Sequence, residues 1–319
     1  MIAETLTRPV GFVFGGGGSL GASQVGMLRA LAEQDVVADL VVGSSVGALN
    51  GAVAALDPAG GADRLAQVWA HMTRGMVFPG GPLTEAWTLR RTRTHLFPSS
   101  GLAAVIANFL GAASSFADLA LPFGAVTTDL ATAAPHLITT GPLLPALLAS
   151  AAIPAIYPAV DLDGRQLCDG GVTANVPMRQ ALAMGARSLV VLDTAFPGHL
   201  PPPPQTAAEA VFYAVFVTMR TQAVLDAPIA AAGVPVVYLP GPSLRRISPL
   251  DFGHTDALVK EAYSVARSFL EKVEIAGPGL YGSPSDPAIR WSGAAASPER
   301  HWPLRSWRAR AARTQLPPR

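Results

Sequence analysis

A serine between two glycines is the first residue of this chain that could carry out chemistry. Ser45 lies in Gly43-Ser-Ser-Val-Gly47, directly after the apolar run 39–42. Such a G-x-S-x-G segment holds a nucleophilic hydroxyl on a tight turn from strand to helix, and Gly43 and Gly47 allow the two elements to approach closely. The segment predicts a serine nucleophile for acyl transfer. The plainer alternative is a structural serine in a turn rich in small residues.

A run of four glycines, Gly15–Gly18, follows another short apolar run at 11–14. The backbone N–H groups of such a loop can converge on a developing oxyanion. The same residues also fit the dinucleotide-binding fingerprint Gly16-x-Gly18-x-x-Gly21. That fingerprint needs an acidic residue at the end of the second strand, where this chain has the serine turn instead. We therefore favour the oxyanion loop.

A serine nucleophile needs a base, and two kinds of residue are available. Of the six histidines, His254 is the best placed, just before the last expected helix. Asp169, followed by Gly170 and Gly171, is a stronger candidate because it ends an expected strand after a hairpin turn at 163–164. An aspartate is a poor base at its usual pKa of about 3.9, but burial raises that pKa. By spacing alone, Asp169 is equally compatible with a residue that only orders a turn.

The elements that must position these residues alternate between strand and helix from the start of the chain. Alternation of this kind is typical of an α/β fold with a mostly parallel sheet. Residues 57–121 do not show this alternation. They are either a cap beside the site or helices packed at the edge of the sheet. Strands are expected at 11–14, 39–42, 123–130, 189–193 and 234–239, the last of them closing the sheet, and helices at 46–55, 143–150 and 255–270.

Composition limits the class of protein. The chain has 319 residues, of which 50% are hydrophobic and 14% charged, enough for a large core. A net charge of +1 argues against a nucleic-acid partner, and the single cysteine, Cys168, excludes an internal disulfide. Four prolines interrupt the apolar stretch 137–160, so we expect no transmembrane helix. No signal peptide is visible, so we expect a cytoplasmic location.

Taken together, these motifs resemble the patatin-like phospholipase family. The similarity spans about residues 10–195, and it rests on Gly16–Gly21, Gly43–Gly47 and Asp169–Gly171, with supporting matches at Ser150–Pro158 and Asn175–Pro177. It implies a three-layer α/β/α sandwich with a mostly parallel central sheet. It also implies activity on lipid acyl esters without a metal or cofactor. Hydrolysis of phospholipids, lysophospholipids or neutral carboxylesters is the expected activity.

The resemblance also assigns roles within the site. It implies a Ser45–Asp169 dyad in which Ser45 attacks the ester and Asp169 takes its proton. The oxyanion hole would come from Gly16, Gly17 and Gly18, and the elbow and dyad glycines would be Gly43, Gly47, Gly170 and Gly171. The family usually has Lys or Arg where this chain has Leu20, so a positive charge is missing beside the loop. Leu20, Ile153, Ile156 and Tyr157 would instead offer an acyl chain an apolar surround, or would simply be core.

Several alternatives stay open at this point. An acyltransferase would use the same nucleophile with another acceptor, and a catalytically weak lipid-binding or regulatory protein would use the same fold. The hydrolase domain is expected over 8–276, followed by a loosely ordered basic tail over 277–319, with seven arginines and three tryptophans after residue 289. Such a tail would either touch an anionic membrane peripherally or remain solvated. The oligomeric state is left open.

Overall fold

The computed structural model describes residues 2–194, 204–205, 207–242 and 247–284. The expected basic tail beyond residue 284 therefore lies outside the described residues, as does most of a proline run at 201–204. The described residues before 285 belong to one compact unit. No described helix combines the length and apolarity needed to cross a membrane.

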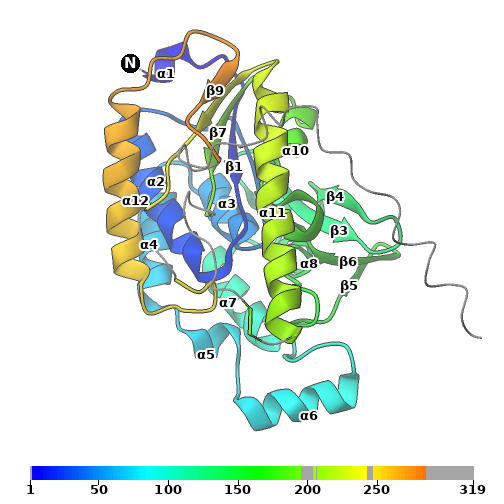
Figure 1. Cartoon of the computed structure of the whole chain (residues 1–319). Helices are drawn as coiled ribbons and strands as arrows, with labels where there is room; N and C mark the ends of the chain where they lie inside the picture. Colours follow the sequence, from blue (N-terminus) through cyan, green and yellow to red (C-terminus); the bar gives the residue numbers. More distant parts are fainter. Residues whose placement is uncertain (1, 195–203, 206, 243–246, 285–319) are drawn as a thin grey trace, which may run out of the picture. The chain divides into compact units, whose positions relative to one another are not determined.

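A mixed sheet of nine strands forms the centre of the described unit (Figure 1). The order is β5-β6-β3-β2-β1-β7-β8-β9, and β4 pairs with β3. The strands from β3 to β9 along this path are parallel, whereas β4 and β6 are antiparallel to β3, and β5 is antiparallel to β6. The bounds are β1 Val10–Phe14, β2 Leu40–Ser44, β3 Phe123–Asp129, β4 Ala134–Ile138, β5 Val160–Leu162, β6 Arg165–Asp169, β7 Ser188–Leu192, β8 Pro235–Tyr238 and β9 Gly279–Tyr281.

Helices surround the sheet. The first is α1 (Ile2–Thr5), and a 3-10 turn, η1 (Gly18–Gly21), precedes α2. A second 3-10 turn, η2 (Phe116–Asp118), precedes β3. The remaining helices are α2 Ala22–Ala32, α3 Val46–Leu56, α4 Gly61–His71, α5 Arg74–Val77, α6 Pro82–Thr92, α7 Ser100–Leu110, α8 Leu143–Ser150, α9 Gly171–Ala174, α10 Met178–Ala183, α11 Ala207–Ala231 and α12 Thr255–Leu270.

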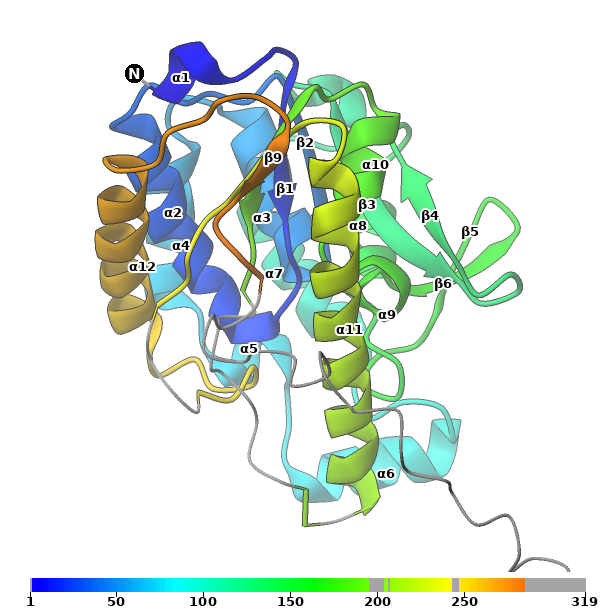
Figure 2. The same ribbon diagram turned by 45° about the horizontal axis from the view of Figure 1, so that its top comes forward.

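Alternate side chains of the central strands enter two separate cores, which makes the fold three-layered. Phe12 and Phe14 of β1 pack with α2, α3 and α12 on one face, whereas Val13 packs with α10 and α11 on the other. All five residues of β1, β2 and β7 are buried, as expected for parallel strands covered on both faces. The turned view in Figure 2 shows α2 and α12 on one side of the sheet and α10 and α11 on the other. The predicted α/β/α sandwich is confirmed.

Two elements differ from the expectations. The strand at β8 is not the last one, because β9 pairs with it in parallel at the sheet edge, beyond the domain end expected at 276. Residues 277–281 are too short and too rich in glycine to show periodicity. Helix α11 has no counterpart among the expected elements, although it spans 25 residues.

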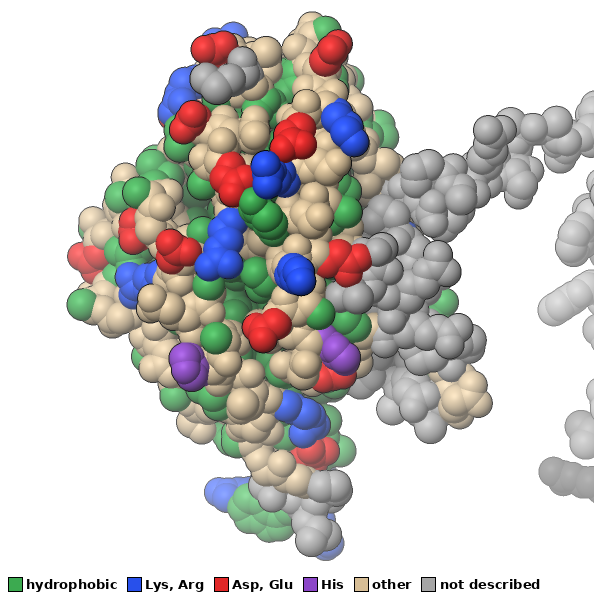
Figure 3. Space-filling model, turned by 90° about the vertical axis from the view of Figure 1, so that its left-hand side faces the viewer, with side chains coloured by type: hydrophobic (Ala, Val, Ile, Leu, Met, Phe, Trp, Pro, Cys, Tyr) green, Lys and Arg blue, Asp and Glu red, His purple; other side chains and the backbone are tan. Residues whose placement is uncertain are grey.

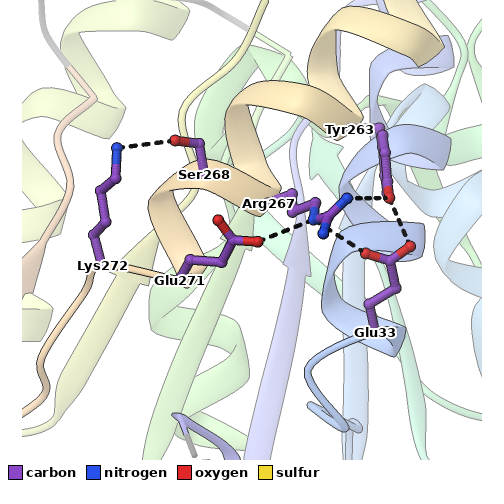
Figure 4. Close-up of polar contacts among 6 residues, drawn as sticks. All are labelled: Glu33, Tyr263, Arg267, Ser268, Glu271 and Lys272. Atoms are coloured by element: carbon purple, nitrogen blue, oxygen red, sulfur yellow. Dashed lines mark hydrogen bonds and ion pairs between the residues drawn. The ribbon is translucent and has the colours of Figure 1, made fainter.

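Helix α12 lies along α2, and a small residue permits the close approach. A Cβ at Gly26 would lie 2.2 Å from the carbonyl oxygen of Val259, so a side chain does not fit there. At the exposed rim, Arg267 lies between Glu33 and Glu271, and the Tyr263 hydroxyl donates to Glu33 Oε1 at 2.6 Å (Figure 4). Exposed ion pairs of this kind contribute little to stability, so apolar packing holds the two helices together.

Candidate active site

Ser45 occupies the turn between β2 and α3 in a strained conformation. Its φ is 56° and its ψ is −130°, a region that residues with a side chain rarely adopt. The turn is possible because its glycines leave no room for side chains. A Cβ at Gly43 would lie 2.3 Å from the carbonyl oxygen of Gly47, and one at Gly47 would lie 2.3 Å from that of Phe14. The strand, the turn and α3 therefore present the Ser45 hydroxyl at the carboxyl ends of the parallel strands.

Asp169 ends β6 and faces Ser45. Ser45 Oγ donates a hydrogen bond of 2.6 Å to Asp169 Oδ2, and the N–H of Gly171 donates one of 2.7 Å to Oδ1. Both Ser45 and Asp169 are buried. Burial raises the pKa of Asp169 to about 6, against the lowering effect of these two hydrogen bonds. The carboxylate thus orders its own turn and also contacts the serine.

The glycines after Asp169 are required by close packing. A Cβ at Gly170 would lie 2.1 Å from the carbonyl oxygen of Val126, and one at Gly171 would lie 3.0 Å from Asp169 Oδ1. A side chain at Gly170 would push the β6 end away from β3. Because β3 neighbours β2, this would also move Asp169 away from the serine turn.

The glycine loop touches the serine turn, but its amides differ in what they contact. The N–H of Gly16 donates to the carbonyl oxygen of Asn175 at 3.1 Å, so this amide is not free to bind an oxyanion. The N–H groups of Gly17 and Gly18 donate to none of the residues that the structure describes. A Cβ at Gly16 would lie 2.9 Å from Ser45 Cβ, which shows how closely the loop approaches the nucleophile. Of the three glycines expected to supply oxyanion donors, Gly16 therefore has an occupied amide, and the roles of Gly17 and Gly18 stay predictions.

Buried polar side chains hold the loop from beneath. Gln24 Nε2 donates to the carbonyl oxygens of Gly15 at 2.9 Å and Leu192 at 2.8 Å. Gln24 Oε1 in turn accepts from Asn50 Nδ2 at 2.7 Å, and Asn50 Oδ1 accepts from Trp69 Nε1 at 3.0 Å. No sequence motif indicates this chain of contacts, because its members are far apart along the chain.

Ser150 is a second contact that sequence analysis did not single out. Its Oγ accepts a hydrogen bond from the N–H of Ser45 at 3.0 Å and donates one to the carbonyl oxygen of Val126 at 2.6 Å. Ser150 is fully buried at the end of α8. It belongs to the supporting motif Ser150–Pro158, so the motif pointed to the residue without showing what its hydroxyl contacts.

An apolar pocket opens beside Ser45, which is one of its lining residues. Of the four residues expected to form an apolar surround, Ile153 and Tyr157 line this pocket, whereas Leu20 and Ile156 are buried elsewhere in the core. Segment 57–121 supplies seven of the fifteen lining residues and also packs against α3. These seven are Trp69, Met72, Val77, Phe78, Leu102, Val105 and Phe109.

The histidines and metal-binding side chains offer no second site. His254 is exposed, and its Nε2 lies 3.3 Å from Asp251 Oδ2. No histidine of the described segments lines the pocket. Within the same segments, no cluster of three or more His, Cys, Asp or Glu side chains is placed to hold a metal ion. Asp169 is therefore the ionisable side chain in contact with Ser45.

Comparison with known proteins shows which family the chain resembles. The family model described as patatin-like phospholipase matches residues 12–182. The chain is 34% identical over 196 residues to "Patatin-like phospholipase domain-containing protein 7" of Mus musculus, covering 60% of this chain and 14% of that protein. It is 24% identical to "Lysophospholipase nte1" of Aspergillus oryzae, covering 85% of this chain and 18% of that protein.

The aligned region thus spans less than a fifth of either curated relative. Among solved structures, VipD from Legionella pneumophila is similar with a TM-score of 0.46 and 12% identity, over 83% of this chain and 67% of that chain. The family model covers more than half of the 319 residues, including the serine turn, the glycine loop and Asp169. This chain belongs to the patatin-like phospholipase family.

Proposed function

We propose that this chain is a serine hydrolase of lipid acyl esters, with Ser45 as the nucleophile and Asp169 as its base. One observation carries the proposal: the 2.6 Å hydrogen bond from Ser45 Oγ to Asp169 Oδ2, beside an apolar pocket. Membership of a phospholipase family and the lysophospholipase name of one relative support a lipid substrate.

In the first half of the reaction, Ser45 Oγ attacks the carbonyl carbon of the ester while its proton passes to Asp169 Oδ2. The negative charge that develops on the carbonyl oxygen would be stabilised by the N–H groups of Gly17 and Gly18. The tetrahedral intermediate then collapses, its bond to the alcohol oxygen breaks, and the alcohol leaves with the proton from Asp169. The product is an acyl group esterified to Ser45.

In the second half, water takes the place of the alcohol. Asp169 accepts a proton from the water as its oxygen attacks the acyl carbon, and the proton returns to Ser45 Oγ as the acyl–serine bond breaks. A fatty acid is released and the free enzyme is restored. A base with a pKa of about 6 suits both directions, because it is ionised near neutral pH and still gives up its proton readily.

The pocket sets the class of acyl group. Apolar side chains surround the space beside Ser45, so an acyl chain placed there would be removed from water, with a gain of about 0.8 kcal/mol per buried methylene. No charged side chain lines this pocket. The pocket therefore accepts the hydrocarbon part of the substrate, and the headgroup stays outside it.

Ester hydrolysis by two adjacent serine variants tests this proposal. We expect Ser45→Ala to lower kcat on p-nitrophenyl esters and on lysophosphatidylcholine by about a thousandfold or more. The matched control is Ser44→Ala, because Ser44 Oγ is buried without a hydrogen-bond partner among the described residues. Ser44→Ala should keep most of the activity. Equal losses in both variants, or turnover that survives in Ser45→Ala, would refute the nucleophile. Turnover only when an acceptor alcohol is added would indicate an acyltransferase.

A further inference from the structure

Helix α6 stands away from the rest of the unit in both views of the ribbon (Figures 1 and 2). Its polar residue Thr88 is buried, whereas the large side chains beside it are not: Trp87 is 61% exposed and Leu89 is 44% exposed. Trp87 and Leu89 are two positions apart and therefore lie on opposite sides of the helix, whereas Arg91, four positions after Trp87, lies on the same side as the tryptophan.

The exposed side of α6 is also basic. Arg90, Arg91 and Arg93 are exposed, and none has an acidic partner among the described residues. The guanidinium of Arg91 lies 5.3 Å from the centre of the Trp87 ring. In Figure 3, the lowest part of the molecule carries hydrophobic side chains next to basic ones. Over the longer stretch 64–117, the sequence has five arginines and a single acidic residue, Glu85, which faces Arg74 at 3.9 Å.

The segment 79–96, which carries α6, is fixed at both ends beside the pocket. Phe78 comes before this segment and Phe97 comes after it. Both rings pack against Tyr157, with centroid distances of 5.9 and 6.4 Å. The N–H groups of Leu96 and Phe97 donate to the carbonyl oxygens of residues 155 and 156. Phe78 and Tyr157 themselves line the pocket beside Ser45. Because both ends of its segment are anchored beside the pocket, a surface bound by α6 would lie near the pocket.

We propose that α6 docks the protein on an anionic lipid surface, with Trp87 inserted at the interface and the three arginines facing the lipid headgroups. The choice of a lipid partner rests on the proposed function, while the docking itself rests on the exposed side chains of α6. Tryptophan and arginine have an apolar body and a polar end, which suits the boundary between water and acyl chains. Unpaired arginines are each attracted to anionic headgroups by about 1 kcal/mol.

Binding to vesicles tests this proposal separately from catalysis. Full-length protein carrying Ser45→Ala is mixed with vesicles of phosphatidylcholine alone or with phosphatidylserine, and the bound fraction is measured by flotation. We expect binding to the anionic vesicles that weakens with salt. Reversal of two arginines by R90E/R91E should weaken it by about tenfold or more. Trp87→Ala should weaken it as well.

Two control variants match these changes elsewhere on the surface. K260E/K272E, with Lys260 on α12 and Lys272 just after it, makes the same change in net charge, and Val37→Ala shortens an aliphatic side chain that is 49% exposed. Neither should alter vesicle binding. The α6 variants with Ser45 intact should still hydrolyse a short soluble ester, which shows that the fold is preserved.

The possible failures are distinguishable. If R90E/R91E and Trp87→Ala bind anionic vesicles like the parent, or if the parent binds none, α6 is not a lipid-docking element. The second result would favour a protein partner for the same helix. If the parent binds vesicles through α6 but the protein with Ser45 hydrolyses no lipid ester, docking stands and the proposed function fails.

Discussion

The hydroxyl of Ser150 lies 3.0 Å from the backbone nitrogen of Ser45 and accepts its hydrogen bond. The same hydroxyl donates to the carbonyl oxygen of Val126 on β3, so one buried side chain ties the serine turn to the neighbouring strand. Because the Ser45 amide is occupied, it is not free to bind an oxyanion. The strained backbone of Ser45 is held by this contact together with the packing of Gly43 and Gly47.

We predict that Ser150→Ala impairs catalysis more than it impairs folding. The change leaves the N–H of Ser45 buried without a partner, at a cost of about 1–3 kcal/mol, and lets the turn shift. We expect kcat on a p-nitrophenyl ester to fall by about tenfold or more. Ser23→Ala is the control, because Ser23 is equally buried and its hydroxyl donates only to the carbonyl oxygen of Leu20. Equal activities of the two variants would contradict a positioning role for Ser150.

Asp169→Asn is expected to abolish turnover while stabilising the fold at neutral pH. Burial raises the pKa of Asp169 from 3.8 to about 6, so the folded state favours the neutral carboxyl. That stability is fully present below pH 3.8 and is lost as the pH rises through 6. At about 1.4 kcal/mol per pKa unit, the loss is up to about 3 kcal/mol at pH 7.5. Asparagine is neutral at every pH, so the variant does not lose this stability as the pH rises.

Denaturant unfolding of both proteins at two pH values measures this effect. The free energy of unfolding of Asp169→Asn should exceed that of the wild type at pH 7.5 and match it near pH 4. Asp161→Asn, at an exposed position on β5, is the control and should change little at either pH. A variant that is less stable than the wild type at pH 7.5 would show that the carboxylate is better stabilised than its burial suggests.

The activity should follow the ionisation of the same group. Asp169 accepts a proton from Ser45 only when it is ionised, so kcat/KM on a soluble ester should fall about tenfold per pH unit below pH 6 and level off above it. Initial rates from pH 4.5 to 8 measure this profile. A profile that stays flat down to pH 4.5 would mean that the ionised form of Asp169 is not required.

A larger side chain at Val105 should shorten the acyl chains that the enzyme accepts. Val105 is buried on α7 and lines the pocket. If Val105→Phe displaces about two methylenes of a long acyl chain, kcat/KM should fall by about tenfold for p-nitrophenyl decanoate and change little for the acetate. Val105→Ala, which enlarges the pocket at the same position, is the control. A uniform loss on both esters would place the acyl chain elsewhere.

Much of the fold was predictable because its signals are local. The helix at 143–150 has the predicted bounds, and the strands at β1, β2, β3 and β7 lie within a residue or two of the expected ones. Buried parallel strands are short apolar runs, and such runs are visible in any sequence. Helix α11 was missed because apolar residues are spread around it rather than gathered on one face. Strand β9 was missed because three residues at a sheet edge carry no pattern.

The sequence by itself determined the serine turn, the glycine loop, the Asp169 turn and the family, because each depends on a few adjacent residues whose types restrict the backbone. Only the tertiary structure decided which groups contact Ser45. Asp169 and Ser150 lie 124 and 105 positions away along the chain, and the Gly16 amide is occupied by the distant Asn175. Such contacts depend on the order of strands in the sheet, which brings the ends of β2, β3 and β6 together. No local pattern encodes that order.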